Sequence, residues 1–250
     1  MKPNNAMRNV NLTHAIAEDL GVAIIKGKYP AETVFAEEAL STTYGASRTA
    51  LREAIKMLTA KGLIASRPRQ GTQVLGEAHW NLLDPDVVRW LLQRNFSIDL
   101  LIEFTEVRLA IEPKAAARAA RCATAAAKTA IAAAIDRMAA AANGADDPLE
   151  SDISFHVAVL RASGNRFYEN LSQLTETALR FSIRQTNEYK GVPVGNVDDH
   201  RRVAEAILKS DSQEASTQMS KMIQEALDLM RDAESRQTSR VRTNDGTAKR

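Results

Sequence analysis

The chain has 250 residues, 44% of them hydrophobic, which is enough to bury a core in each of two domains. Its formal net charge of +2 conceals a basic first third, an acidic middle and a basic end. A single cysteine excludes an intrachain disulfide, and no apolar run approaches the roughly 20 residues of a membrane span or forms a signal-peptide core, so we expect a cytoplasmic protein.

The first segments carry helical patterns that turn residues separate. Residues 1–10 show no periodicity, and we expect them to be disordered. Apolar residues then recur at helical spacing over 11–26, and Gly27 can end that helix. A second short helix is predicted over 36–44, with a turn at Gly45.

The stretch 46–74 predicts a third helix followed by a two-stranded hairpin. Ser47 is a suitable N-cap for the helix, and Gly62 can end it. Two short strand-like segments then flank a turn rich in Arg, Pro and Gly, which is typical of a wing. Three helices and a hairpin within residues 11–76 predict a winged helix-turn-helix.

Positive charge is concentrated on this predicted unit. Between Gly45 and Gly71, six basic residues face the single carboxylate of Glu53. The resulting local charge of +5 suits a polyanion better than a small substrate. Arg48 and Arg52 lie one turn apart at the helix start and off its apolar stripe, where a recognition helix presents side chains to base edges and phosphates.

The second half of the chain changes character at about residue 79, where strand signals vanish. Residues 77–84 are the expected linker or hinge, and 85–235 predict an all-α bundle of six or seven helices. Cys122 is expected to be a small buried residue. Residues 236–250 are polar and basic without periodicity, and we expect a disordered tail. The fold class is therefore mainly α.

Several segments resemble the GntR family of bacterial transcriptional regulators. SRTALREAIKMLTAKGLI (47–64) and RPRQGTQV (67–74) are similar to the DNA-binding domain of that family. Three further segments resemble the FCD ligand-binding domain of its FadR branch: EVRLAIEPKAAARAA (106–120), SDISFHVAVLRASGN (151–165) and DDHRRVAEAILKSD (198–211). The junction HWNLLDPDVVRWLL (79–92) is similar to the sugar-acid branch, which includes D-galactonate-responsive repressors.

The resemblance implies a homodimeric regulator, a repressor rather than an enzyme, that binds a pseudo-palindromic double-stranded DNA operator. It assigns DNA contact to Ser47, Arg48, Thr49, Arg52, Gln70 and Gly71. The guanidinium fork of Arg48 suits a guanine edge, whereas Arg52 suits phosphate. The alternative is a solvated helix face. The chain departs from the family at Glu38, which stands in place of an arginine and whose charge would repel phosphate.

A candidate metal site lies in the second half of the chain. Asp152 and His156 are four residues apart on one predicted helix, so both can point to one site. With His200 they form a ligand set suited to Zn²⁺ or a similar divalent ion. The resemblance implies a third histidine at the position of Met222, whose thioether is a poor Zn²⁺ ligand. The alternative is a polar pocket without metal, where the histidines bind the effector directly.

Arginines in the same half are candidates for binding an anionic effector. Arg108 sits among apolar neighbours and needs an anionic partner if it is buried. The resemblance implies that this partner is the effector's carboxylate, and the alternative is an internal salt bridge to Glu112 or Glu106. Arg184 and Arg180 can either turn inward toward the effector or lie on a solvated face.

These observations leave three hypotheses open. In the first, a small organic acid such as an aldonate binds Arg108, Asp152, His156, His200 and Arg184 and releases the protein from its operator. In the second, Zn²⁺ is itself the effector. In the third, the chain is a metal-dependent hydrolase, although no general base or nucleophile accompanies the metal ligands.

Overall fold

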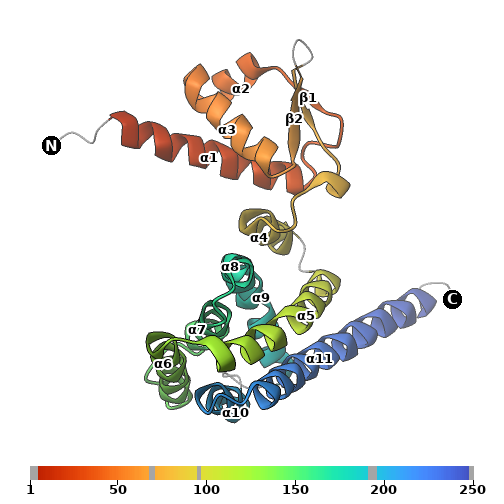
Figure 1. Cartoon of the computed structure of the whole chain (residues 1–250). Coiled ribbons are helices and arrows are strands. Elements are labelled where there is room, and N and C mark those ends of the chain that lie inside the picture. Colours follow the sequence, from red (N-terminus) through yellow and green to blue (C-terminus); the bar gives the residue numbers. More distant parts are fainter. Residues whose placement is uncertain (1–4, 68–70, 95–96, 191–195, 248–250) are drawn as a thin grey trace. The chain divides into compact units, whose positions relative to one another are not determined.

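The structure is a computed structural model in which the chain divides into two compact units, Met1–Phe96 and Ser97–Arg250. It describes residues 5–67, 71–94, 97–190 and 196–247, and Figure 1 shows their helices and strands. Every helix in these ranges is too short or too polar to cross a bilayer.

The N-terminal unit is a winged helix-turn-helix followed by one further helix. Its elements are α1 (Asn5–Ile25), β1 (Val34–Phe35), α2 (Glu37–Tyr44), α3 (Arg48–Ala60), β2 (Ile64–Arg67), β3 (Gly71–Val74), a 3₁₀ turn (Glu77–His79) and α4 (Pro85–Arg94). The apolar stripe of α3, including Leu51 and Leu58, is buried in one core with Ile16 and Leu20 of α1. The predicted helices and hairpin are confirmed.

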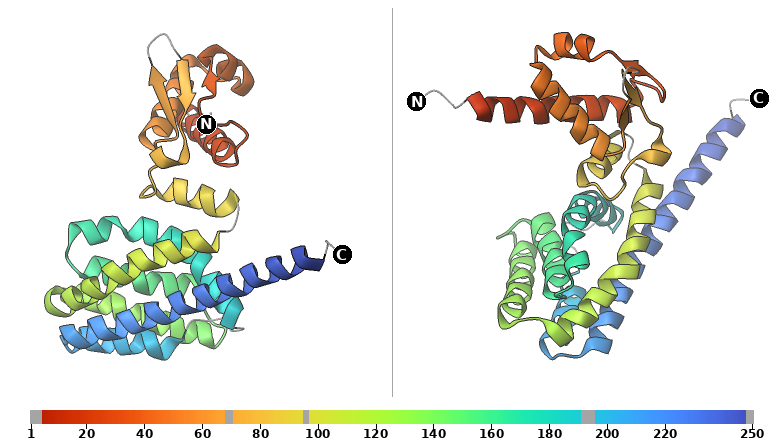
Figure 2. Two further views of the ribbon diagram at one scale, coloured as in Figure 1. Left: turned by 90° about the vertical axis from the view of Figure 1, so that its right-hand side faces the viewer. Right: turned by 45° about the horizontal axis from the view of Figure 1, so that its top comes forward.

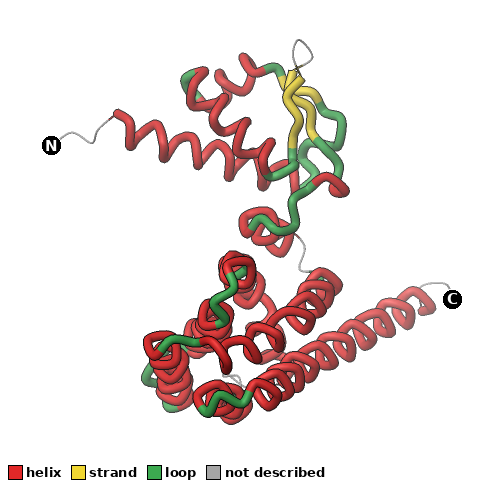
Figure 3. Tube along the Cα trace, in the orientation of Figure 1, coloured by secondary structure: helices red, strands yellow, loops and turns green. Residues whose placement is uncertain are grey.

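The wing belongs to a small antiparallel sheet, whose strands are yellow in Figure 3. The strand order is β1-β3-β2. Val74 pairs with Ile64 across the hairpin, and Gln73 pairs with Val34 of β1. The strand β1 was not predicted, because two residues are too few to show the alternation that identifies a strand.

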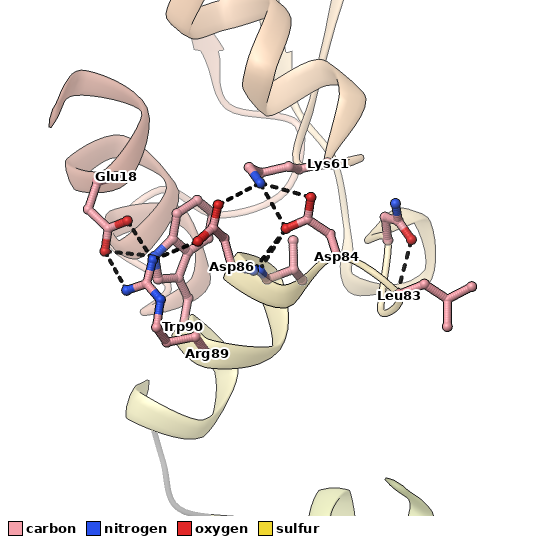
Figure 4. Close-up of polar contacts among 9 residues, drawn as sticks. Glu18, Lys61, Leu83, Asp84, Asp86, Arg89 and Trp90 are labelled. Carbon is pink, nitrogen blue, oxygen red and sulfur yellow. Dashed lines mark hydrogen bonds and ion pairs between the residues drawn. The ribbon is translucent and has the colours of Figure 1, made fainter. Parts of the chain in front are cut away.

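Helix α4 packs on α1, within the N-terminal unit (Figure 4). Trp90 of α4 is 2% exposed, and its ring lies so close to Gly21 that a Cβ atom there would be 2.5 Å from it. The indole Nε1 donates a hydrogen bond to Oε1 of Glu18 at 2.8 Å. The structure thus differs from the expected linker at 77–84 and the expected domain start at 85, because the core of the N-terminal unit buries one face of α4.

Charged groups hold the same helix in place. Nζ of Lys61 donates to the carboxylates of Asp84 and Asp86 at 2.8 Å, and Arg89 makes a two-pronged contact with Glu18. Burial opposes the charge of Lys61, but these hydrogen bonds outweigh that cost and raise its pKa. A buried ammonium therefore keeps both of its carboxylate partners at the start of α4.

The C-terminal unit is all-helical. Its described helices are α5 (Ile98–Cys122), α6 (Ala125–Ala142), α7 (Pro148–Ala162), α8 (Arg166–Asn170), α9 (Ser172–Lys190), α10 (Val197–Leu208) and α11 (Ser212–Thr247). The predicted bundle is confirmed, with two differences in its makeup. Helix α4 lies in the other unit, and the segment 166–190, whose pattern indicates helix throughout, contains two helices, α8 and α9. Helices α5 and α11 run side by side (Figure 2).

The structure differs from three expectations about exposure and order. Helix α1 already begins at Asn5, within the segment 1–10 that we expected to be disordered, and α11 continues to Thr247, well into 236–250. An established helix continues until a residue stops it, and a lack of apolar periodicity does not do so. Cys122 is free and exposed rather than buried, because it lies at the last residue of α5.

Candidate functional site

Four of the six predicted DNA-contact residues, Ser47, Arg48, Thr49 and Arg52, lie at the exposed start of α3. The hydroxyl of Ser47 accepts a hydrogen bond from the backbone N–H of Ala50 and caps the helix. Arg48, Thr49 and Arg52 are exposed, whereas the apolar stripe of the helix is buried. The structure therefore presents two guanidinium groups to solvent from a rigid helix, which is the geometry that groove recognition requires.

Two acidic side chains of α2 accompany these arginines. Oε1 of Glu38 lies 3.5 Å from Nη2 of Arg48, and Oε2 of Glu37 lies 3.6 Å from Nε of Arg52. The sequence identified Glu38 as a charge that would oppose phosphate, but it did not show that both arginines have a carboxylate partner.

At the wing, Gly71 is required by its surroundings in the sheet. Its φ of +88° lies in the left-handed region, and a Cβ atom there would come within 3.0 Å of the carbonyl oxygen of Phe35. The glycine thus permits β3 to approach β1. The other predicted wing residue, Gln70, lies outside the described residues.

A cavity of about 60 Å³ lies in the C-terminal unit, among α5, α7, α9, α10 and α11. It brings together four of the predicted effector and metal residues, Arg108, Asp152, His156 and His200, and its wall also includes Met222. These side chains come from four different helices. Their convergence therefore depends on the whole bundle, not on one local motif.

Three ligand atoms in this cavity point to a common position. One atom each from Asp152, His156 and His200 lies within 4.8 Å of the others. Both histidine Nε2 atoms are near Oδ1 of Asp152, at 3.4 Å and 3.5 Å. Among the described residues, Oδ1 of Asp152 and Nε2 of His200 are buried without a hydrogen-bond partner. Buried polar atoms are rarely left unpaired, and a divalent cation would satisfy these two together.

The second nitrogen of each histidine is held by a group that only accepts hydrogen bonds. Nδ1 of His156 lies 2.6 Å from Oε2 of Glu112, and Nδ1 of His200 lies 2.8 Å from the carbonyl oxygen of Asn196. Both Nδ1 atoms must therefore carry the proton, which leaves Nε2 facing the cavity. This arrangement orients histidines for metal binding in proteins. The residues present fit a divalent ion with an open fourth position.

Burial and charge set the ionisation of this cluster. Burial opposes the charged form of Glu112, but Arg108 and His156 outweigh it and lower its pKa to about 2. Burial likewise opposes the charge of Asp152, yet His200 and His156 lower the pKa of that carboxyl well below its usual range. The pKa of His156 is raised, because Glu112 and Asp152 outweigh its burial and the charge of Arg108. The cluster thus holds two carboxylates in their ionised form.

Arg108 has an internal partner and also borders the cavity. Its Nε donates to Oε1 of Glu112 at 2.6 Å, and Nη2 lies 3.3 Å from Nδ1 of His156. The salt bridge that sequence reasoning kept as the alternative is therefore present. The sequence analysis named Glu112, at i,i+4 spacing, as a possible partner of Arg108 but did not predict its contact with His156.

The remaining predicted arginines lie elsewhere. Arg180 pairs with Glu150 and Glu176. Arg184 is exposed and is not among the described residues that line the cavity, contrary to the expectation that it binds the effector.

Comparisons with known proteins match each of the two units to a known domain. The model for "Bacterial regulatory proteins, gntR family" matches residues 12–74, and the model for the FCD domain matches residues 103–225. The uncharacterized HTH-type transcriptional regulator YieP of Escherichia coli K12 is 31% identical, and the match covers 82% of this chain and 89% of YieP. The galactonate operon transcriptional repressor of the same organism is 30% identical, with 82% and 91% covered.

One solved structure supports the fold. A structure of Lar, described as controlling expression of the Listeria monocytogenes agr system, matches with a TM-score of 0.56 at 18% identity over 88% of this chain and 96% of the Lar chain.

A winged unit with an exposed cationic helix, joined to a helical unit with a buried polar cavity, defines a DNA-binding transcriptional regulator with a sensing domain. The chain belongs to the GntR family, in its FadR-type group with an FCD domain.

Proposed function

We propose that this protein is a ligand-responsive repressor whose operator binding is relieved by a small hydroxycarboxylate. One observation carries the proposal. The cavity that sequence reasoning assigned to the effector contains a buried guanidinium, Arg108, next to three converging ligand atoms from Asp152, His156 and His200. A positive charge beside a potential metal site is suited to an anion with more than one oxygen ligand.

The residues Asp152, His156 and His200 would hold the divalent ion, for which Zn²⁺ is the best match to one carboxylate and two imidazoles. When bound, the ion would supply a Lewis-acidic anchor for an oxygen of the effector. Met222 leaves a position without a strong protein ligand, and an effector oxygen or water can occupy it. Arg108, although paired with Glu112, retains donors that a carboxylate can accept.

The names of two relatives narrow the effector class. One is the galactonate operon transcriptional repressor, and another, 27% identical over 74% of this chain, is a putative L-lactate dehydrogenase operon regulatory protein of Escherichia coli K12. Galactonate and lactate are both 2-hydroxy acids. Their carboxylate and adjacent hydroxyl can chelate one cation together. We therefore propose a 2-hydroxy acid, with aldonates first among the candidates.

The proposed repressor acts as a homodimer on a pseudo-palindromic operator, because two recognition helices are needed to read two half-sites. The effector releases DNA only if it binds more tightly to a state of the dimer whose winged units no longer match the half-site spacing. A ligand with equal affinity for both states would leave operator binding unchanged.

The test combines calorimetry with an operator-release assay. D-galactonate and L-lactate are titrated into the full chain with Zn²⁺ and after chelation, and DNA release is followed on a duplex selected from random sequence. Arg108→Lys keeps a cation for Glu112 but loses the fork, whereas the control Arg118→Lys changes an exposed arginine of the same helix. We expect weaker acid binding only in Arg108→Lys. Equal affinities in both variants would refute the site.

The same assay decides the second candidate, a metal sensor. The unpaired ligand atoms of Asp152 and His200 favour it as much as they favour a metal-anchored effector. Release of DNA by Zn²⁺ alone, with no further effect of either acid, would assign the effector role to the ion.

A further inference from the structure

The two exposed arginines of α3 each face a carboxylate from the first turn of α2. Nη2 of Arg48 lies 3.5 Å from Oε1 of Glu38, and Nε of Arg52 lies 3.6 Å from Oε2 of Glu37. Both pairs line one hollow between the two helices. The surface that the recognition helix offers to DNA therefore carries negative as well as positive charge.

These pairs do little for the stability of the fold. The side chain of Arg48 is 81% exposed and that of Glu38 is 88% exposed. Water screens ion pairs at such positions, so their contribution to folding is small. Glu37 is less exposed, at 41%, and can position Arg52. Glu38 therefore adds little to the fold, and its carboxylate is free to contact what this surface binds.

We propose that Glu38 is a specificity-determining residue that lowers affinity for DNA in general and selects a cytosine in the operator half-site. A carboxylate on this surface repels backbone phosphates, so it weakens every complex that rests on charge alone. In the major groove, however, cytosine presents its N4 amino group as a donor, which a glutamate can accept.

The distance between Arg48 and Glu38 fits the recognition of a G·C pair by both side chains. Guanine presents two acceptors to the fork of Arg48, and its cytosine partner presents N4 on the same groove edge. Arg48 and Glu38, whose charged ends are 3.5 Å apart, can reach one G·C pair or two adjacent pairs, since successive base pairs are about 3.4 Å apart. In the free protein Glu38 lies beside Arg48, and at the correct site both groups exchange this contact for base contacts. This proposal rests on the DNA-binding role of the family and not on the proposed effector.

The test uses the full chain and the variants Glu38→Gln and Glu38→Arg. Glu77→Gln is the matched control, because Glu77 is also an exposed carboxylate paired with an arginine, Arg94, in the same unit. Each protein selects duplexes from a random pool. Its affinity is then measured by fluorescence anisotropy over a salt series, on the wild-type selected duplex and on a scrambled one.

We expect Glu38→Gln to bind scrambled DNA more tightly and to lose roughly tenfold in the ratio of selected to scrambled affinity. Its selected duplexes should no longer require a cytosine at one position per half-site. Glu38→Arg should also steepen the salt dependence by about one phosphate contact. Glu77→Gln should match the wild type in base preference and in affinity ratio.

Two results would overturn the proposal. The first is an unchanged base preference and affinity ratio in Glu38→Gln, and the second is an equal change in Glu38→Gln and Glu77→Gln, which would reveal an effect of net charge only. If the wild-type chain selects no sequence, specific DNA binding itself fails and this proposal fails with it. A loss of effector response with intact base selection would count against the proposed effector alone.

Discussion

Nδ1 of His156 lies 2.6 Å from Oε2 of Glu112, and the same carboxylate accepts a hydrogen bond from Arg108 through its other oxygen. One buried carboxylate thus orients a candidate metal ligand and holds the cation expected to meet the effector. Because Glu112 contacts both residues, we expect it to couple the two proposed binding functions of the cavity.

This coupling predicts that Glu112→Gln weakens metal binding although Glu112 is not a ligand. Loss of the charged partner of a ligating histidine lowers metal affinity by about 10- to 100-fold. Zinc affinity is measured by competition with a chromogenic chelator. Glu106→Gln is the control, because Glu106 is an exposed carboxylate on the same helix, paired with Arg231. Equal zinc affinity in both variants would remove the orienting role.

A pH dependence of stability follows from the pKa of Glu112, which is lowered from 4.5 to about 2. Because the folded pKa is below the unfolded one, this stabilisation is fully present above pH 4.5 and is lost as the pH falls toward 2. It amounts to roughly 3 kcal/mol. Urea unfolding of the metal-free chain should show a steeper loss below pH 4.5 in the wild type than in Glu112→Gln. The same pH dependence of stability in both proteins would contradict this role of Glu112.

Arg48→Ala should abolish specific operator binding and leave the fold intact. The predicted base contact is worth about 1–3 kcal/mol in each half-site. The side chain is 81% exposed, so its removal creates no cavity. The measurement is a mobility shift at matched salt, with thermal unfolding as the check on folding. Arg94→Ala, in the same unit but on α4, should bind normally. An unchanged shift for Arg48→Ala would remove this assignment.

Gly21→Ala should destabilise the N-terminal unit by about 1–3 kcal/mol despite the higher helix propensity of alanine. The new Cβ would lie 2.5 Å from the ring of Trp90, so the ring must move and its hydrogen bond to Glu18 must weaken. Gly76→Ala is the control, since the nearest atom to its Cβ is 3.9 Å away. Thermal unfolding of both variants measures the difference, and a Gly21→Ala variant as stable as Gly76→Ala would show that the ring relocates freely.

The sequence predicted those parts of the molecule that local patterns determine. The cap at Ser47, the stripe of α3 and the hairpin depend on neighbouring residues, and all three are present. The convergence of Asp152, His156 and His200 was predicted through the family resemblance, since spacing alone joins only the first two.

What the sequence did not show depends on contacts between distant segments. Glu112 becomes part of the cavity only when α5 packs beside α7, and its own segment gives no sign of His156. The segment from residue 85 was expected to begin the helical bundle, but an amphipathic pattern does not show which surface a helix will cover. The reach of α11 was underestimated because its last turns lack an apolar stripe.

The packing of Trp90 against Gly21 has a consequence for engineering. A fragment that stops at the end of the wing would lose the side chain that fills the groove on α1 and would leave the ammonium of Lys61 without Asp84 and Asp86. Such a fragment should aggregate, whereas a fragment that extends to Arg94 retains α4, which covers this face of α1. Chimaeras that exchange sensing domains between relatives should therefore be joined after α4, so that each DNA-binding unit keeps its own Trp90.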